Sequence, residues 1–146
     1  MKALIQRVTG AEVTVEGKTV GAIDRGILVL LGVEKGDTDR DLEHIVRKIA
    51  NLRIFYDTEG KMNLSVKDVA GEVLVVSQFT LSADCRKGNR PSFVNAEEPK
   101  KAEKMYQKAA EGLKKEGISV STGEFAAYMQ VSLINDGPVT FFLDSR

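Results

Sequence analysis

Ile27-Leu28-Val29-Leu30-Leu31-Gly32-Val33 is the longest apolar stretch of this 146-residue chain, and it decides the fold. A strand that is covered on both faces is apolar along its whole length, whereas a half-buried strand alternates apolar and polar residues. We therefore predict the central strand of a sheet here. The stretch is far shorter than the ~20 apolar residues that a helix needs to cross a bilayer, so we expect no transmembrane helix.

Further strands are predicted on both sides of this central strand. Glu72–Ser77 is a second buried-strand pattern, and the other segments are alternating or short apolar runs bounded by turn residues. Glu16-Gly17 has the form of a two-residue hairpin turn, in which glycine supplies the positive φ. Asp136-Gly137-Pro138 joins the last two strands. The remaining predicted strands are Lys2–Val8, Ala11–Val15, Lys18–Ile23, Ile54–Tyr56, Ile118–Ser121, Met129–Asn135 and Val139–Leu143.

Two amphipathic helices complete the pattern. The first begins near Asp37, with Asp and Thr as capping residues, and the second runs from Pro99 to Glu116 and ends at Gly117. These elements predict an α/β fold: a mixed, largely antiparallel sheet in two layers, covered on one side by the two helices (a three-layer α/β/β arrangement). A chain of 146 residues has the size of one domain, so we predict a single domain over residues 1–146.

The composition excludes several classes of protein. Lys and Arg together number 21, as do Asp and Glu, so no overall field draws the chain toward DNA or an anionic membrane, and any RNA contact must be local. Cys85 is the only cysteine and His44 the only histidine, which excludes an internal disulfide and a structural zinc cluster. We expect no metal and no cofactor. Because Met1–Arg7 lacks the form of a signal peptide, we expect a cytoplasmic protein.

Ser77-Gln78-Phe79-Thr80 is the first candidate site. A buried strand that ends in three hydrogen-bonding side chains either caps its own backbone or meets a ligand, and the pattern alone leaves both interpretations open. In the second interpretation Thr80 acts as a nucleophile or orients a water, and Gln78 donates to a developing oxyanion. No base for Thr80 is evident, because His44 falls off the apolar stripe of its helix and is interpreted as a solvated surface residue.

Two further segments carry candidate binding groups. The loop from Asp84 to Phe93 contains Arg86, Lys87 and Arg90 and ends in an aromatic residue. Such a loop can contact phosphate and stack on a base, although a solvated loop fits equally well. Asn135-Asp136-Gly137-Pro138 has the composition of an ordinary turn. X-Pro bonds are cis in ~5% of folded cases, and a cis bond here would aim two carbonyl groups to one side, where they can hold an ammonium group.

Three motifs carry a family resemblance: Ser77-Gln78-Phe79-Thr80-Leu81, Lys87-Gly88-Asn89-Arg90-Pro91-Ser92-Phe93 and Asn135-Asp136-Gly137-Pro138-Val139-Thr140. Together they closely resemble the motifs of the D-aminoacyl-tRNA deacylases, also called D-tyrosyl-tRNA deacylases. The opening Met1–Val8 and the segment Gly60–Ser65 match as well, so the resemblance spans essentially the whole chain. One departure is Ala126, at a position where the family commonly has glycine.

The resemblance implies a homodimeric, cytoplasmic enzyme that acts on aminoacyl-tRNA. It would hydrolyse the ester between a D-amino acid, or glycine on a non-cognate tRNA, and the terminal adenosine. In that family the Gly-Pro dipeptide, here Gly137-Pro138, is a cis peptide that enters the pocket of the other subunit. The motif Ser77–Leu81 forms the pocket floor, Arg7 is expected near the inserted Gly-Pro, and Met129 is expected on the adenosine side.

The implied chemistry agrees with the missing triad. An aminoacyl ester is labile, so holding its carbonyl, a water and a nearby hydroxyl in place is enough to accelerate hydrolysis. The family is described both with the threonine of the first motif as nucleophile and with the 2′-hydroxyl of the tRNA assisting water. The lack of a base beside Thr80 favours the second description.

Chirality can be read by backbone groups alone. If two carbonyls hold the α-ammonium group and the ester fixes the carbonyl carbon, only a hydrogen fits toward the pocket wall at the third position. An L side chain then clashes there, whereas glycine passes. Two alternatives stay open: an ordinary esterase that uses Thr80, and a non-catalytic RNA-binding protein that uses the loop around Arg86 and Arg90.

Overall fold

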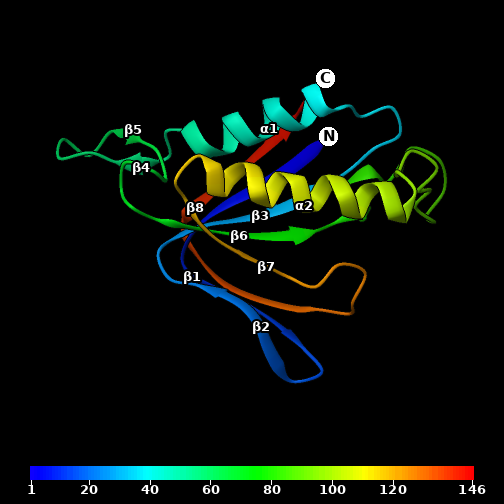
Figure 1. Ribbon diagram of the computed structural model, residues 1–146, viewed down its shortest axis with the longest axis horizontal. Coiled ribbons are helices and arrows are strands. Elements are labelled where there is room, and N and C mark those ends of the chain that lie inside the picture. Colours follow the sequence, from blue (N-terminus) through cyan, green and yellow to red (C-terminus); the bar gives the residue numbers. More distant parts are fainter.

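The computed structural model describes residues 1–146, which form a mixed sheet with two helices on one side (Figure 1). The elements, in chain order, are β1 (Lys2–Val15), β2 (Lys18–Ile23), β3 (Gly26–Gly32), α1 (Asp39–Asn51), β4 (Phe55–Tyr56), β5 (Met62–Leu64), β6 (Glu72–Ser77), the 3-10 helix η1 (Phe79–Ser82), α2 (Pro99–Lys115), β7 (Ser119–Thr122) and β8 (Gln130–Asp144). Six strands form the main sheet, in the order β2-β1-β3-β6-β7 with β8 also paired to β1. β4 and β5 form a separate hairpin.

β3 lies at the centre of the sheet, as its apolar sequence predicts. It pairs antiparallel with β1 and parallel with β6, and all of its residues except Leu30 are buried. Gly26 begins β3 because a side chain there has no room. A Cβ atom on Gly26 would lie 1.9 Å from the backbone oxygen of Glu72 on β6. Where β3 and β6 begin, their backbones therefore lie too close together for a side chain at position 26.

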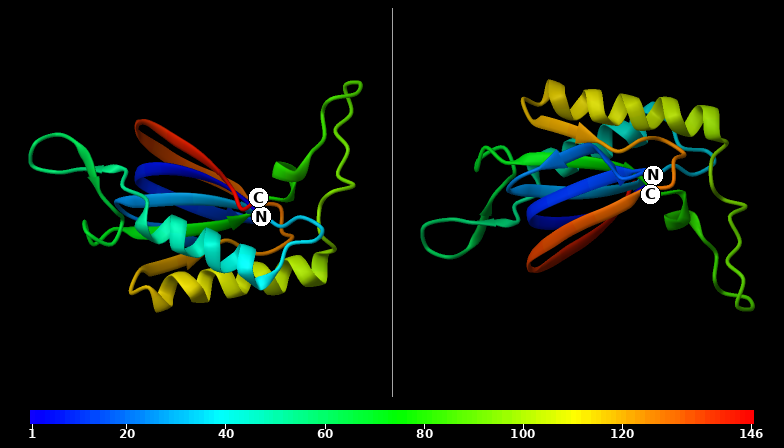
Figure 2. Two further views of the ribbon diagram at one scale, coloured as in Figure 1. Left: turned by 90° about the horizontal axis from the view of Figure 1, so that it is seen from above. Right: turned by 90° about the horizontal axis from the view of Figure 1, so that it is seen from below.

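Two apolar cores, one on each face of β3 and β6, make the protein three layers deep. α1 and α2 cover one face and enclose the larger core of 23 buried residues, which includes Ile45 and Leu113. On the other face, β2 and the second half of β1 enclose a smaller core of 7 buried residues, among them Val13, Ile23 and Leu74. Figure 2 shows the helices on one side of the sheet and β8 on the other. The predicted three-layer α/β/β fold is confirmed.

β1 and β8 run side by side and bend together. Lys2–Val8 of β1 pairs with β3 and Ala11–Val15 pairs with β2, so the two predicted N-terminal strands are halves of one strand. β8 pairs antiparallel with both halves, with a register shift between Asn135 and Thr140. The last two predicted strands are therefore also one strand, and the segment between them is a bulge rather than a turn joining paired strands. The same residue types favour a turn and a bulge, so the sequence pattern did not distinguish one from the other.

The helices begin and end at capping groups. Asp41 accepts hydrogen bonds from the backbone N–H and the hydroxyl of Thr38, at 2.9 and 2.6 Å, and these bonds hold the pKa of Asp41 well below its usual range. Glu98 caps α2 by accepting from the backbone N–H groups of Lys100 and Lys101. Gly117 follows α2 with φ at 83°, as the sequence predicts. Neither helix has the length and apolarity that crossing a membrane requires.

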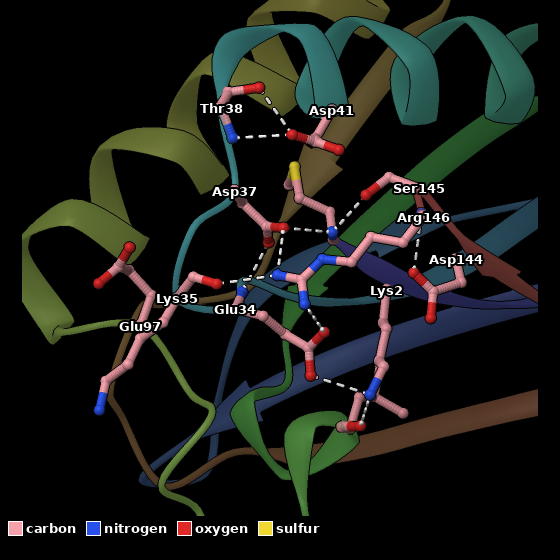
Figure 3. Close-up of polar contacts among 12 residues, drawn as sticks. Lys2, Glu34, Lys35, Asp37, Thr38, Asp41, Glu97, Asp144, Ser145 and Arg146 are labelled. Carbon is pink, nitrogen blue, oxygen red and sulfur yellow. Dashed lines mark hydrogen bonds and ion pairs between the residues drawn. The ribbon is translucent and has the colours of Figure 1, made fainter.

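A buried ion-pair cluster joins the two ends of the chain to the start of α1 (Figure 3). The amino group of Met1 donates to Asp37 Oδ1 at 2.7 Å and to the hydroxyl of Ser145 at 2.5 Å. Asp37 Oδ2 accepts from the backbone N–H of Glu34 at 2.7 Å. Arg146 adds a hydrogen bond to Asp37 Oδ1 at 3.3 Å. This cluster fixes β1 beside the end of β8 and holds the turn that leads into α1.

Candidate active site

An apolar cavity of about 510 Å³ lies between the start of α2, the ends of β3 and β6, and the segment 125–131. Ser77, Gln78 and Phe79 of the first candidate motif line it, as does Met129. Most of the other lining side chains are apolar, so the polar atoms of Ser77 and Gln78 stand at the edge of an apolar chamber. The structure thus brings together four of the residues singled out from the sequence.

The candidate motif leaves the sheet through a tight turn rather than as a continued strand. β6 ends at Ser77, the Gln78 N–H donates to the Leu31 oxygen at 2.8 Å, and the 3-10 helix η1 begins at the next residue. Gly32 allows this close packing, since a Cβ atom there would lie 3.0 Å from the Gln78 oxygen and 3.2 Å from the Leu81 Cβ. The turn points Phe79 and Thr80 outward, and both are exposed.

Thr80 has an amide, not a base, as its neighbour. Gln78 Nε2 donates a hydrogen bond to Thr80 Oγ1, and an amide nitrogen cannot accept the threonine proton. The only histidine, His44, lies on α1 next to Arg47, away from the cavity. Thr80 itself is not among the cavity-lining residues. The arrangement can position a water or a carbonyl oxygen, but it offers no side-chain base for a threonine nucleophile.

Tyr106 lines the same cavity and carries a buried hydroxyl. The sequence places Tyr106 on the apolar face of α2, where it is 5% exposed, and its hydroxyl donates to the Val75 oxygen at 2.9 Å. Burial raises the pKa of Tyr106 to about 12. The sequence analysis did not single out this residue as a candidate for the site. The signal it overlooked is that a buried tyrosine hydroxyl needs a polar partner.

The cationic loop reaches the site through its last aromatic residue. The rings of Phe93 and Phe79 make an edge-to-face contact with 5.0 Å between centroids. Arg86 pairs with Asp84 at 2.6 Å, and this contact holds the pKa of Asp84 well below its usual range and raises that of Arg86. Lys87 and Arg90 are exposed at the tip of the loop. Figure 2 shows the loop extending away from the sheet.

Arg7 of β1 holds the bulge of the neighbouring strand β8 through a hydrogen bond. The side chain is 3% exposed and donates from Nε to the Asp136 oxygen at 2.9 Å and from Nη1 to the Ile54 oxygen at 2.6 Å. Its guanidinium lies over the ring of Tyr56, 4.7 Å from the centroid. Within the bulge, the Val139 N–H donates to Asn135 Oδ1 at 2.7 Å. These bonds replace the ladder pairing that the extra residues interrupt.

Gly137-Pro138 lies far from Ser77–Thr80 within the chain. The bulge lies beside Arg7, which pairs with Ile27 at the start of β3, whereas Ser77 pairs with Leu31 at the end of that strand. Four residues of extended strand separate these positions, which is about 13 Å along the sheet. Gly137 and Pro138 are exposed, and the bond between them is cis. Figure 2 shows the bend of β8 and η1 toward opposite ends of the main sheet.

Comparison with known proteins identifies the family. The family model described as D-Tyr-tRNA(Tyr) deacylase matches residues 4–144. A D-aminoacyl-tRNA deacylase of Magnetococcus marinus is 63% identical over 145 residues, which are 99% of this chain and 96% of that protein. The chain belongs to the D-Tyr-tRNA(Tyr) deacylase family. Another relative, the D-aminoacyl-tRNA deacylase of Thermotoga petrophila, is 58% identical over 99% of this chain and 97% of its own length.

Solved structures extend the comparison to three dimensions. A structure described as the c-Myc DNA unwinding element binding protein is 50% identical, has a TM-score of 0.94 and covers 100% of this chain, with 99% of its own length matched. A probable eukaryotic D-amino acid tRNA deacylase shares the fold at 17% identity, with a TM-score of 0.83 and coverage of 97% for both chains. Membership in the deacylase family makes this chain a hydrolase of ester bonds.

The deacylase family resemblance noted in the sequence is thus confirmed. Its one departure has a visible consequence, since Ala126 adopts φ of 61°, a left-handed conformation that favours glycine. Ala126 also lines the cavity. No group of three or more His, Cys, Asp or Glu side chains is placed to hold a metal ion.

Proposed function

We propose that this protein hydrolyses the ester between a D-amino acid and the terminal adenosine of tRNA, releasing the free amino acid and tRNA. We propose the same reaction for glycine attached to a non-cognate tRNA. The observation that carries the proposal is the position of Ser77, Gln78 and Phe79 at the edge of the 510 Å³ apolar cavity. Family membership supports the choice of substrate.

The cavity has the size and chemistry for the terminal adenosine. Small-molecule sites commonly have volumes of about 300–1,000 Å³ and mostly apolar walls, and this one is lined by Met129, Phe125 and Tyr106 among others. The rest of the tRNA must lie outside. Lys87 and Arg90, exposed on the loop that contacts Phe79 through Phe93, are proposed to meet its phosphates.

The proposed chemistry is positioning without a protein base. Thr80 Oγ1 accepts from Gln78 Nε2, so the threonine hydrogen remains available to donate to a water or to the ester oxygen. The 2′-hydroxyl of the terminal ribose, held next to the ester carbonyl, then assists the attacking water. Effective concentrations reached by such alignment are large enough to accelerate a labile ester.

A second copy of the chain is proposed to complete the site. Gly137-Pro138 and Ser77–Thr80 lie toward opposite ends of the sheet in one chain, so in this fold they can meet only between two molecules. The outer side of β8 has no neighbouring strand and carries exposed apolar side chains, with Ile134 67% and Phe142 53% exposed. In the proposed homodimer the Gly137 and Pro138 carbonyls of the partner hold the α-ammonium group and exclude an L side chain.

The proposal places the protein in the cytoplasm, where aminoacyl-tRNA is used. Its partners are aminoacyl-tRNA and a second copy of this chain, with no DNA, membrane or cofactor. The balance of 21 cationic and 21 acidic residues supports a local rather than a general attraction to nucleic acid.

The direct test is release of amino acid from charged tRNA by the purified protein. D-tyrosine should be released from D-tyrosyl-tRNA while L-tyrosyl-tRNA is spared, and equal cleavage of both would overturn the proposal. Replacing the terminal adenosine with 2′-deoxyadenosine should abolish turnover, whereas Thr80→Ala should reduce it only mildly. The reverse pattern would mean an ordinary esterase with Thr80 as nucleophile. Binding of tRNA without any release would mean a non-catalytic RNA-binding protein.

Mixing two variants tests the shared site. Gln78→Ala and Pro138→Ala each damage one half of the site, and a site shared between chains is rebuilt intact once in every mixed dimer. After unfolding and refolding together in equal amounts, half of the dimers are mixed and each has one intact site of two. Activity should rise from that of either variant alone, which has no intact site, to about a quarter of that of the parent protein. A site contained in one chain would show no recovery.

A further inference from the structure

Tyr106, which lines the cavity, forms a clasp with Gly123 behind the cavity wall. The Tyr106 hydroxyl donates to the Val75 oxygen at 2.9 Å and reaches the Gly123 oxygen at 3.3 Å. The Gly123 N–H donates to the same Val75 oxygen at 3.0 Å. One hydroxyl of α2 therefore ties the last part of β6, two residues before Ser77, to the segment that follows β7.

The missing side chain at Gly123 makes room for Met129. A Cβ atom on Gly123 would lie 2.7 Å from the Met129 sulfur, closer than non-bonded atoms approach, but 3.7 Å from its next neighbours on Val13 and Val76, which is ordinary contact. Alanine at this position therefore conflicts with one atom only, near the end of a flexible side chain. The backbone of Gly123 does not have a positive φ, so it accepts alanine without strain.

Met129 is the link between this clasp and the cavity. It lines the cavity together with Tyr106 and Phe125, whose rings are 5.8 Å apart between centroids. A methionine side chain displaced from its place against Gly123 has the open cavity beside it. The position of the methionine thus determines how much of the cavity a substrate group can occupy.

We propose that Tyr106 and Gly123 are positioning residues that set the depth of this cavity by holding Met129 against its wall. This inference rests on the proposed function, in that the cavity receives part of the aminoacyl-tRNA. The clasp acts on binding rather than on the reacting atoms, because Ser77, Gln78 and Thr80 lie beyond it and keep their own contacts.

The test is a double-mutant cycle between Gly123→Ala and Met129→Ala, read as KM and kcat for D-tyrosyl-tRNA. Gly123→Ala should raise KM on the order of tenfold and leave kcat within about twofold, since a displaced side chain obstructs binding. In the Met129→Ala background, the same substitution should change KM by less than about twofold, because the atom it displaces is gone. Equal effects in both backgrounds would overturn the proposal.

A second readout is independent of activity. In protein with 13C-labelled methionine methyl groups, Gly123→Ala should move the Met129 methyl resonance, assigned by its loss in Met129→Ala. The matched control is Gly10→Ala, whose Cβ would lie 3.6 Å from the Ile23 oxygen and should leave that resonance and KM unchanged. A Met129 resonance that does not move in Gly123→Ala would refute the clasp.

Tyr106→Phe provides a variant that keeps the shape of the protein. It removes one oxygen and should shift the same resonance and raise KM by about threefold, so it replaces Gly123→Ala if that variant does not fold. A parent protein that fails to cleave D-tyrosyl-tRNA would refute the proposed function. The methyl resonances would still decide whether Gly123 and Tyr106 position Met129.

Discussion

Replacing Arg7 with methionine is expected to lower the free energy of unfolding by about 3 kcal/mol. Arg7 is 3% exposed and donates two hydrogen bonds to carbonyl oxygens, at 2.9 Å to Asp136 and at 2.6 Å to Ile54. A hydrogen bond from an ionised donor contributes about 1.5–3 kcal/mol, so two of them contribute about 3–6 kcal/mol. Methionine keeps the apolar stem and removes the cost of a buried charge, which places the expected loss at the lower end.

Urea unfolding followed by circular dichroism measures this loss. For a slope of about 2 kcal/mol per molar urea, the midpoint should fall by roughly 1.5 M. The melting temperature should fall by about 6–12 °C for a chain of this size. The matched control is Arg86→Met. Arg86 pairs with a carboxylate at 2.6 Å, as Arg7 does with Asp136 Oδ2 at 3.2 Å, but the Arg86 side chain is 86% exposed. The control should have the midpoint of the parent protein.

The comparison between these variants decides the argument. If Arg7→Met moves the midpoint no further than Arg86→Met does, the buried hydrogen bonds of Arg7 do not hold the bulge of β8. The bulge would then have to be maintained by Asn135 and the strand pairing on either side of it.

Three further outcomes are expected. Ala126→Gly should raise the free energy of unfolding by about 0.5–1 kcal/mol in a urea titration. A φ of 61° costs alanine about 1–2 kcal/mol, and part of this gain is offset because glycine gives the unfolded chain more conformational entropy. The control Ala127→Gly should lower the free energy of unfolding in the same titration. The pKa of Tyr106 is about 12 in the folded state and about 10 in the unfolded state, so the unfolded chain loses the phenol proton first and stability declines as pH rises through this interval. Between pH 8 and 11 the free energy of unfolding of the parent protein should therefore fall by about 1.4 kcal/mol more than that of Tyr106→Phe. Leu74→Ala in the smaller core, where Leu74 is 0% exposed, should cost about 3–5 kcal/mol by calorimetry, and a cost below 1 kcal/mol would mean that the second layer is loosely packed.

The elements were predictable where local patterning and burial agree. The apolar run of β3 reflects burial on both faces, and the stripe of α1 reflects one face of the helix that meets the core. The bulge of β8 was not predictable in this way, because Asn135, Asp136, Gly137 and Pro138 favour a turn and a bulge for the same reasons. Only the pairing with β1, more than a hundred residues away, selects one of them.

The chain's own residues determined the class of fold, the family and the motif Ser77–Thr80, since these depend on periodicity and on residue identity at short range. The tertiary structure decided what surrounds that motif. It placed α2 and Met129 beside it to form a cavity, gave Thr80 an amide neighbour, and set Gly137-Pro138 at the far end of the sheet. The physical reason is that a cavity and a distance between motifs depend on how distant elements pack, and no local pattern records that packing.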